Sequence, residues 1–159
     1  MLTRRALIPT GLSALALAGC QSAARPGPPV AIATIRIDTA PLAAKGQSAT
    51  AVAIAPMLAR ELSSLRTAPG GQGARLDVVV TGLYLTSYAG GAAATLGNDT
   101  LESTAMLFGP DGREIERHPI LAIMSPSFGG AWYRPDVNQR RIEALVASNA
   151  QWIRRALGG

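Results

Sequence analysis

The segment Leu76–Tyr88, LDVVVTGLYLTSY, constrains the fold of this 159-residue chain more than any other. Its alternate positions form two sets, and both are largely apolar. The first set contains Leu76, Val78, Val80 and Tyr84, and the second contains Val79, Leu83 and Leu85. A strand that is apolar on both faces usually lies in the middle of a sheet. We therefore predict a central strand here.

Two elements precede this strand. Residues 30–38, VAIATIRID, are rich in β-branched residues and predict a strand with Ile35 and Ile37 on one face. A passage of small residues follows, from 39 to 50. Residues 56–66, PMLARELSSLR, predict a helix because their leucines recur at helical spacing. An earlier start near Ser48, with a kink at Pro56, is the alternative.

Three elements follow the central strand. Residues 90–98 are a glycine-rich connection, residues 100–108 predict a strand, and residues 109–112 form a turn into a strand from 113 to about 124. Pro119 cannot donate a ladder hydrogen bond, so this last strand lies at an edge or contains a bulge. After a loop at 125–134, a helix begins at Asp136, which with Gln139 resembles a capping box. Its expected apolar side comprises Val137, Leu145, Val146, Trp152, Ile153 and Leu157, and its expected polar side Arg140, Arg141, Glu143, Arg154 and Arg155.

This order of elements predicts an α+β fold over residues 30–159. The strand–helix–strand unit favours a parallel pair, and the short later connections favour an antiparallel meander. We expect a two-layer sandwich with a four-stranded mixed sheet, β-α-β-β-β-α in order, and two helices on one face.

The N-terminus carries a different signal. Arg4 and Arg5 precede an apolar run from Ala6 to Ala18 that is shorter than the roughly 20 residues of a membrane-spanning helix. The run ends in Leu17-Ala18-Gly19-Cys20. These features resemble the signal peptide and lipobox of bacterial lipoproteins. An ordinary secretory signal or an N-terminal membrane anchor is the alternative. Residues 3–8 also resemble a twin-arginine export motif.

The resemblance implies removal of residues 1–19 and a diacylglyceryl group on Cys20, which would anchor the protein in a membrane. Residues 20–29 would then be the lipidated cysteine and a proline-rich tether, roughly 25–30 Å long. Gln21 is not aspartate, which by resemblance to lipoprotein sorting favours the outer membrane, facing the periplasm. After residue 19 the chain keeps 13 basic and 10 acidic residues, a net charge of +3 that does not suggest a nucleic-acid partner.

Candidate catalytic groups are few. His118, the single histidine, lies near Ser125 and Ser127 in sequence, but no Gly-x-Ser-x-Gly motif is present. Glu114 and Glu116 would share one strand face, yet a salt-bridged edge beside Arg113 and Arg117 explains them better. One histidine and scattered acids predict no metal site, and the glycines at 90–97 lack the lysine of a phosphate loop. We expect no cofactor and no enzymatic activity.

Trp132, Tyr133 and Arg134 combine residue types that are enriched at protein interfaces. With Phe128 they lie in a loop flanked by Gly and Pro, so we predict a partner-contact patch. The alternative is that Trp132 and Tyr133 close the end of the core beneath the last helix.

These observations favour a lipid-anchored, non-enzymatic envelope protein with an accessory or scaffolding role and an envelope protein as partner. In element order the chain is similar to small envelope lipoproteins of the lipopolysaccharide-assembly and ABC-transport auxiliary types. The alternative is a periplasm-facing module that binds lipid or a small apolar ligand between helices and sheet.

Overall fold

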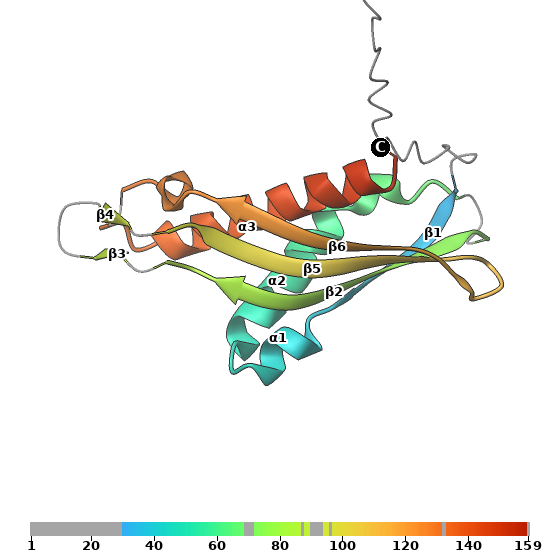
Figure 1. Ribbon diagram of the computed structural model, residues 1–159, viewed down its shortest axis with the longest axis horizontal. Coiled ribbons are helices and arrows are strands. Elements are labelled where there is room, and N and C mark those ends of the chain that lie inside the picture. Colours follow the sequence, from blue (N-terminus) through green and yellow to red (C-terminus); the bar gives the residue numbers. More distant parts are fainter. Residues whose placement is uncertain are drawn as a thin grey trace, which may run out of the picture.

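A four-stranded sheet forms the centre of the molecule (Figure 1). The structure is a computed structural model, and it describes residues 30–68, 72–86, 88–89, 94–95, 97–131 and 133–158. The strands are β1 (Ile32–Asp38), β2 (Ala74–Tyr84), β5 (Asp99–Phe108) and β6 (Glu114–Met124), in the order β1-β2-β5-β6. β1 runs parallel to β2, and the other pairs are antiparallel. The predicted mixed sheet and the central position of β2 are confirmed.

Three α-helices cover one face of this sheet, where two were predicted (Figure 1). They are α1 (Ala40–Ala44), α2 (Ser48–Glu61) and α3 (Val137–Ala156). The extra helix is α1, in the passage of small residues. Asp38 accepts a hydrogen bond from the Ala40 amide at 2.8 Å, and Pro41 in the first turn has the backbone geometry of a helix start. The α+β two-layer architecture is confirmed.

The helix α2 starts at Ser48, which confirms the earlier of the two predicted starts. Pro56 lies inside it, and the 3-10 helix η1 (Ser63–Leu65) follows its end. Beyond β2, the predicted single strand is interrupted. It ends at Tyr84, and the short strands β3 (Tyr88–Ala89) and β4 (Ala94–Thr95) form a separate antiparallel pair.

The core lies between the helices and the covered face of the sheet. Its fully buried side chains come from all three helices and from β2, β5 and β6. They include Leu42, Ile54, Leu58, Leu62, Leu76, Val78, Val80, Leu101, Leu145 and Ile153. Full burial of such a side chain contributes about 1.5–3 kcal/mol. The other face of the sheet carries no helix among the described residues.

A bulge in β2 changes which residues reach this core. Val80 pairs with Ser103 and Gly82 pairs with Glu102, so Thr81 is an extra residue on the β2 side. Beyond the bulge Leu83 packs against the core, and the side chain of Tyr84 is 60% exposed on the open face. The prediction that Tyr84 shares a face with Val78 and Val80 is therefore wrong, because strict alternation stops at Thr81.

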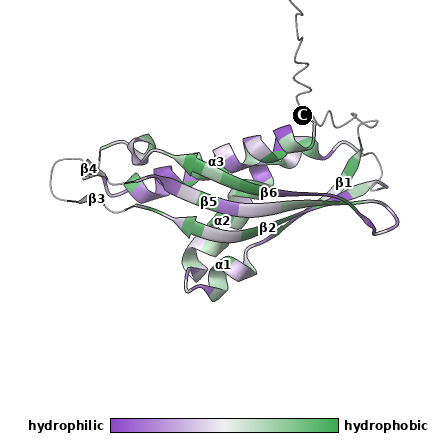
Figure 2. Ribbon diagram, in the orientation of Figure 1, coloured by the Kyte–Doolittle hydropathy of each residue, from purple (hydrophilic) through white to green (hydrophobic). Residues whose placement is uncertain are grey.

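The edge strand β6 contains Pro119, as predicted for an edge. Its character changes along its length, from hydrophilic near Glu114 to hydrophobic near Met124 (Figure 2). The helix α3 lies over β5 and β6 and also contacts α2. At its C-terminal end Arg154 donates a hydrogen bond to the Glu61 carbonyl of α2 at 2.8 Å, which satisfies one of the last carbonyls of that helix.

The predictions for Asp136 and Trp152 of the last helix are wrong. Asp136 precedes the helix, but its side chain makes no capping hydrogen bond, and Gln139 instead donates to Glu143 at 3.0 Å. Trp152, assigned to the apolar side, is 48% exposed and has the Arg155 guanidinium 5.0 Å from its ring centre. A cationic side chain over an indole face is a favourable surface arrangement.

Candidate partner-binding site

The loop between β6 and α3 displays the side chains predicted to contact a partner. Phe128 belongs to the 3-10 helix η3 (Pro126–Gly129) and is 62% exposed, and Tyr133 is 74% exposed. Arg134 is exposed as well, with its Nε 3.3 Å from Asp136 Oδ1. The alternative in which Tyr133 closes the end of the core is therefore wrong. Trp132 lies outside the described residues.

Local sequence gives this loop its shape. The Ser125 hydroxyl accepts a hydrogen bond from the Ser127 amide at 3.4 Å, and Pro126 occupies the first turn of η3. Gly129 packs directly against α3, since a Cβ there would lie 2.7 Å from the Val137 carbonyl oxygen. Gly130 has a φ of 82°, which a residue with a side chain rarely adopts. The chain can therefore turn back closely onto α3.

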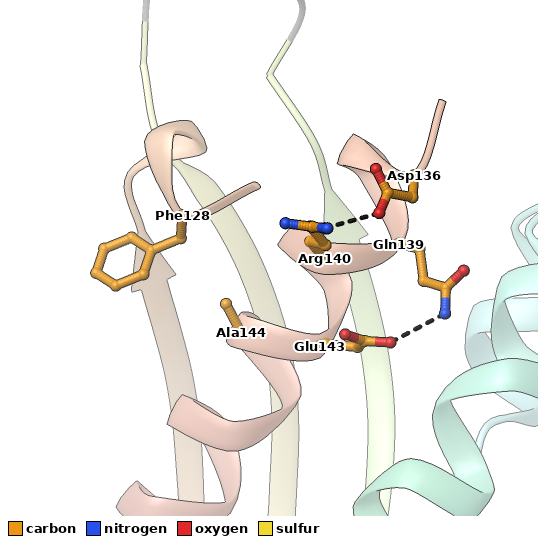
Figure 3. A pocket seen from close by; sticks show the side chains of 6 residues that line it. All are labelled: Phe128, Asp136, Gln139, Arg140, Glu143 and Ala144. Atoms are coloured by element: carbon orange, nitrogen blue, oxygen red, sulfur yellow. Dashed lines mark hydrogen bonds and ion pairs between the residues drawn. The ribbon is translucent and has the colours of Figure 1, made fainter. Parts of the chain in front are cut away.

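A shallow depression separates Phe128 from the first turns of α3 (Figure 3). Its volume is about 590 Å³, and its lining is Phe128, Asp136, Gln139, Arg140, Glu143 and Ala144. Figure 3 shows Phe128 pointing away from α3, while the polar side chains pair along the helix. One border is thus aromatic and the other charged. Such a surface matches an amphipathic segment of a protein better than a small apolar molecule.

Asp136 on the polar border is held in its ionised state by an ion pair with Arg140. Arg140 Nε lies 2.8 Å from Asp136 Oδ2, and this hydrogen bond is the main reason that the pKa of Asp136 falls below its usual value. The nearby Arg134 charge lowers that pKa further. A carboxylate with a lowered pKa is a poor proton donor at neutral pH. Asp136 is therefore suited to orienting cations and not to acid catalysis.

A buried ion pair fixes α3 to the sheet. Arg141 is 3% exposed and Asp99, at the start of β5, is 1% exposed. Arg141 Nε donates to Asp99 Oδ2 at 2.7 Å, and its Nη2 donates to Asp99 Oδ1 and to the Thr86 carbonyl. Arg141 Nη1 donates to Asn138 Oδ1 at 2.9 Å. The Thr86 amide in turn donates to Asp99 Oδ1 at 3.0 Å, so the ends of β2, β5 and α3 share one network.

Sequence reasoning assigned Arg141 to the polar side of α3, which is wrong, and missed this network. The spacing of residues along α3 is the sequence signal that could have placed Arg141 in this network. Val137, Arg141 and Leu145 follow one another at four-residue intervals, so Arg141 occupies the buried face. A cation there requires a buried carboxylate, because an unpaired charge in the interior is too costly.

The carboxylates of β6 are not brought together. A bulge leaves Glu116 opposite Leu107 and Glu114 opposite Phe108, which places the two glutamates on opposite faces of the sheet. Glu114 pairs with Arg117 at 2.6 Å, and the hydrogen bond from Arg117 lowers the Glu114 pKa. The prediction of a shared face is wrong, because it assumed an unbroken strand. The prediction of a salt-bridged edge is confirmed for Glu114.

His118 and the loop serines lie apart. His118 is in β6, with Nε2 2.9 Å from Glu116 Oε2, whereas the hydroxyl oxygens of Ser125 and Ser127 lie 2.8 Å from each other. The six residue steps from His118 to Met124 span about 20 Å at the usual rise of a strand. No hydroxyl nucleophile in the loop can therefore reach the imidazole.

Several of the predicted features involve residues that the structure does not describe. Cys20, the tether and most of the glycine connection at 90–97 are outside the described residues. Within those residues, His, Cys, Asp and Glu side chains form no group of three that could hold a metal ion. None of the described helices is both long enough and apolar enough to cross a membrane.

No protein-family model, curated protein or solved structure matches this chain.

Proposed function

We propose that this chain is a lipid-anchored, non-enzymatic accessory protein of the cell envelope. In this proposal, the patch formed by Phe128, Trp132, Tyr133 and Arg134 holds an envelope protein partner. The observation that carries the proposal is the exposure of Phe128 and Tyr133 on a loop whose Gly129 packs against α3, the helix that the Arg141–Asp99 pair ties to the sheet. Aromatic side chains on a rigid support bind with little loss of conformational entropy.

A filled interior supports an accessory role over the alternative of a ligand-binding module. The residues between helices and sheet, including Leu58, Leu76 and Leu145, are 0% exposed. The depression beside Phe128 and a second one of about 510 Å³, lined by Arg36, Asp77 and Met106 among others, both lie outside this interior. Sites for small molecules are usually concave, mostly apolar and well enclosed.

Membrane anchoring is supported by the resemblance of Leu17-Ala18-Gly19-Cys20 to a lipobox. Cys20 would carry the acyl chains, and residues 21–29 would connect it to the domain that begins near Val30. Two or more acyl chains give durable membrane attachment without a basic surface, and the net charge of +3 after residue 19 fits that arrangement. An outer-membrane position facing the periplasm remains part of this proposal.

The patch can be tested by crosslinking in intact cells. We expect Phe128→Ala combined with Tyr133→Ala to reduce crosslinked partner by about tenfold, because aromatic hot-spot residues typically contribute 2 kcal/mol or more. Val52→Ala is the matched control, since Val52 is an apolar residue 75% exposed on α2. An equal loss in both variants, or no loss in either, would contradict the assignment of the patch.

A further inference from the structure

The outer edge of β6 is unpaired within the part of the chain that the structure describes. β6 is the last strand in the order β1-β2-β5-β6, and its described neighbour is β5 alone. Such an edge presents backbone N–H and C=O groups to which another strand can add. Natural proteins usually protect such edges with charges or proline.

Only half of this edge is protected. The first half carries Glu114, Glu116, Arg117 and Pro119, so an added strand would meet charges and a missing N–H. The second half, residues 120–124, contains neither a charge nor a proline, and Figure 2 shows it as hydrophobic. Leu121 is 52% exposed and Ile123 is 51% exposed on the open face of the sheet.

Pro119 also indicates which backbone groups face outward. An edge-strand proline occupies a position whose N–H side faces solvent, because it has no hydrogen to donate to the ladder. In an antiparallel strand, the N–H and C=O groups of one residue point to the same edge of the strand, and those of every second residue point to that same edge. Leu121 and Ile123 are two and four residues beyond Pro119. Their N–H and C=O groups therefore point toward the free edge.

We propose that a second copy of this chain pairs with this segment, β6 against β6, in antiparallel orientation. The two-fold axis passes at Ala122. Leu121 of each copy then lies opposite Ile123 of the other, and the two sheets join into one of eight strands. A two-fold interface uses the same patch on both subunits, so the patch must complement itself, as this apolar segment does.

The positions of the charges disfavour registers centred nearer the start of β6. With the axis at Ala122, the charged residues 113–117 lie beyond the paired segment. With the axis at Pro119, Leu121 would face Arg117 and Ala122 would face Glu116, which places charges against apolar side chains. The second arrangement is disfavoured, because it removes water from charged groups at an apolar contact.

The open face of the sheet extends the contact. Tyr84 of β2, Thr100 of β5 and Ile123 of β6 lie in one cross-strand row, and Tyr84 is 60% exposed. In the pair this row continues into Leu121 of the second copy. The paired segment is short, so the dimer is weak and depends on protein concentration, as small interfaces do.

Cysteine crosslinking in membranes tests this arrangement with the full chain. Two differently tagged copies are expressed together, one with Leu121→Cys and the other with Ile123→Cys, and are treated with a short bifunctional thiol reagent. We expect a covalent dimer in several-fold higher yield than from Leu121→Cys on both copies, which places the thiols out of register. A pair carrying Val52→Cys on both copies gives the background, and copies without an added cysteine reveal any reaction of Cys20.

A charge at the edge supplies a second readout. Leu121→Lys in both copies, with the chain otherwise unchanged, should weaken the dimer by about tenfold, the factor that 1.4 kcal/mol represents. Val52→Lys should leave it unchanged. The proposal fails if the 121/123 yield does not exceed the Val52 background, if Leu121→Lys has no effect, or if the product contains a different protein in place of the second copy.

Discussion

Arg141 holds its guanidinium against Asp99 where almost no surface of either side chain reaches water. Removing one partner leaves the other charged and buried. We expect Arg141→Ala to lower the free energy of unfolding by about 3–5 kcal/mol. Chemical denaturation followed by circular dichroism measures this difference. Arg134→Ala, at an exposed ion pair, is the control and should leave the denaturation midpoint nearly unchanged.

A denaturation midpoint that moves equally little in both variants would show that the Arg141–Asp99 pair is not a structural anchor.

At the scale of single residues, the sequence predicted some side-chain positions and missed others. Ile35, Ile37 and most apolar residues of α3 were assigned correctly from periodicity. Arg141 was misassigned because hydrophobicity alone decides a pattern-based assignment, and its partner Asp99 is 42 residues away.

Thr81 shows how one extra residue controls a whole element. Deleting it would restore strict alternation in β2 and turn Leu83 and Leu85 toward the open face. We expect a loss of about 1.5 kcal/mol or more for each leucine that leaves the core. Deletion of Gly46 is the comparison, because this residue lies in the α1–α2 turn, where a Cβ would meet no atom within 4 Å.

The measurement is again the free energy of unfolding, and a smaller loss on deleting Thr81 than on deleting Gly46 would contradict this role of the bulge.

Element types and order were predictable, because long runs with clear periodicity define β1, β2, β5, β6 and α3. The bulges in β2 and β6 were not predictable, because an unpaired residue appears only when two strands are aligned. The helix α1 was missed because five residues carry too little periodicity.

At the scale of the whole molecule, attachment to a membrane should depend on Cys20 alone. We expect Cys20→Ser to lose the acyl mass and to leave a protein that is either uncleaved or soluble in the periplasm. The domain from Val30 onward should keep its stability, since the core formed by the described residues begins at Ile32. Mass spectrometry of the N-terminal peptide checks the lipid, and thermal unfolding checks the domain. An unmodified Cys20 in the wild-type protein would refute the anchor.

The register of the sheet separates the two ends of the molecule. The chain enters at Ile32, beside Ala74, whereas Phe128 and Tyr133 follow Met124, at the opposite end of the strands (Figure 1). The ten residue steps from Glu114 to Met124 span about 33 Å. With the proposed tether at full extension and the strands perpendicular to the bilayer, the aromatic loop would reach at most roughly 60 Å from the bilayer. The length of the sheet thus separates the aromatic loop from the anchored end of the chain, and a partner would be bound well away from the lipid surface.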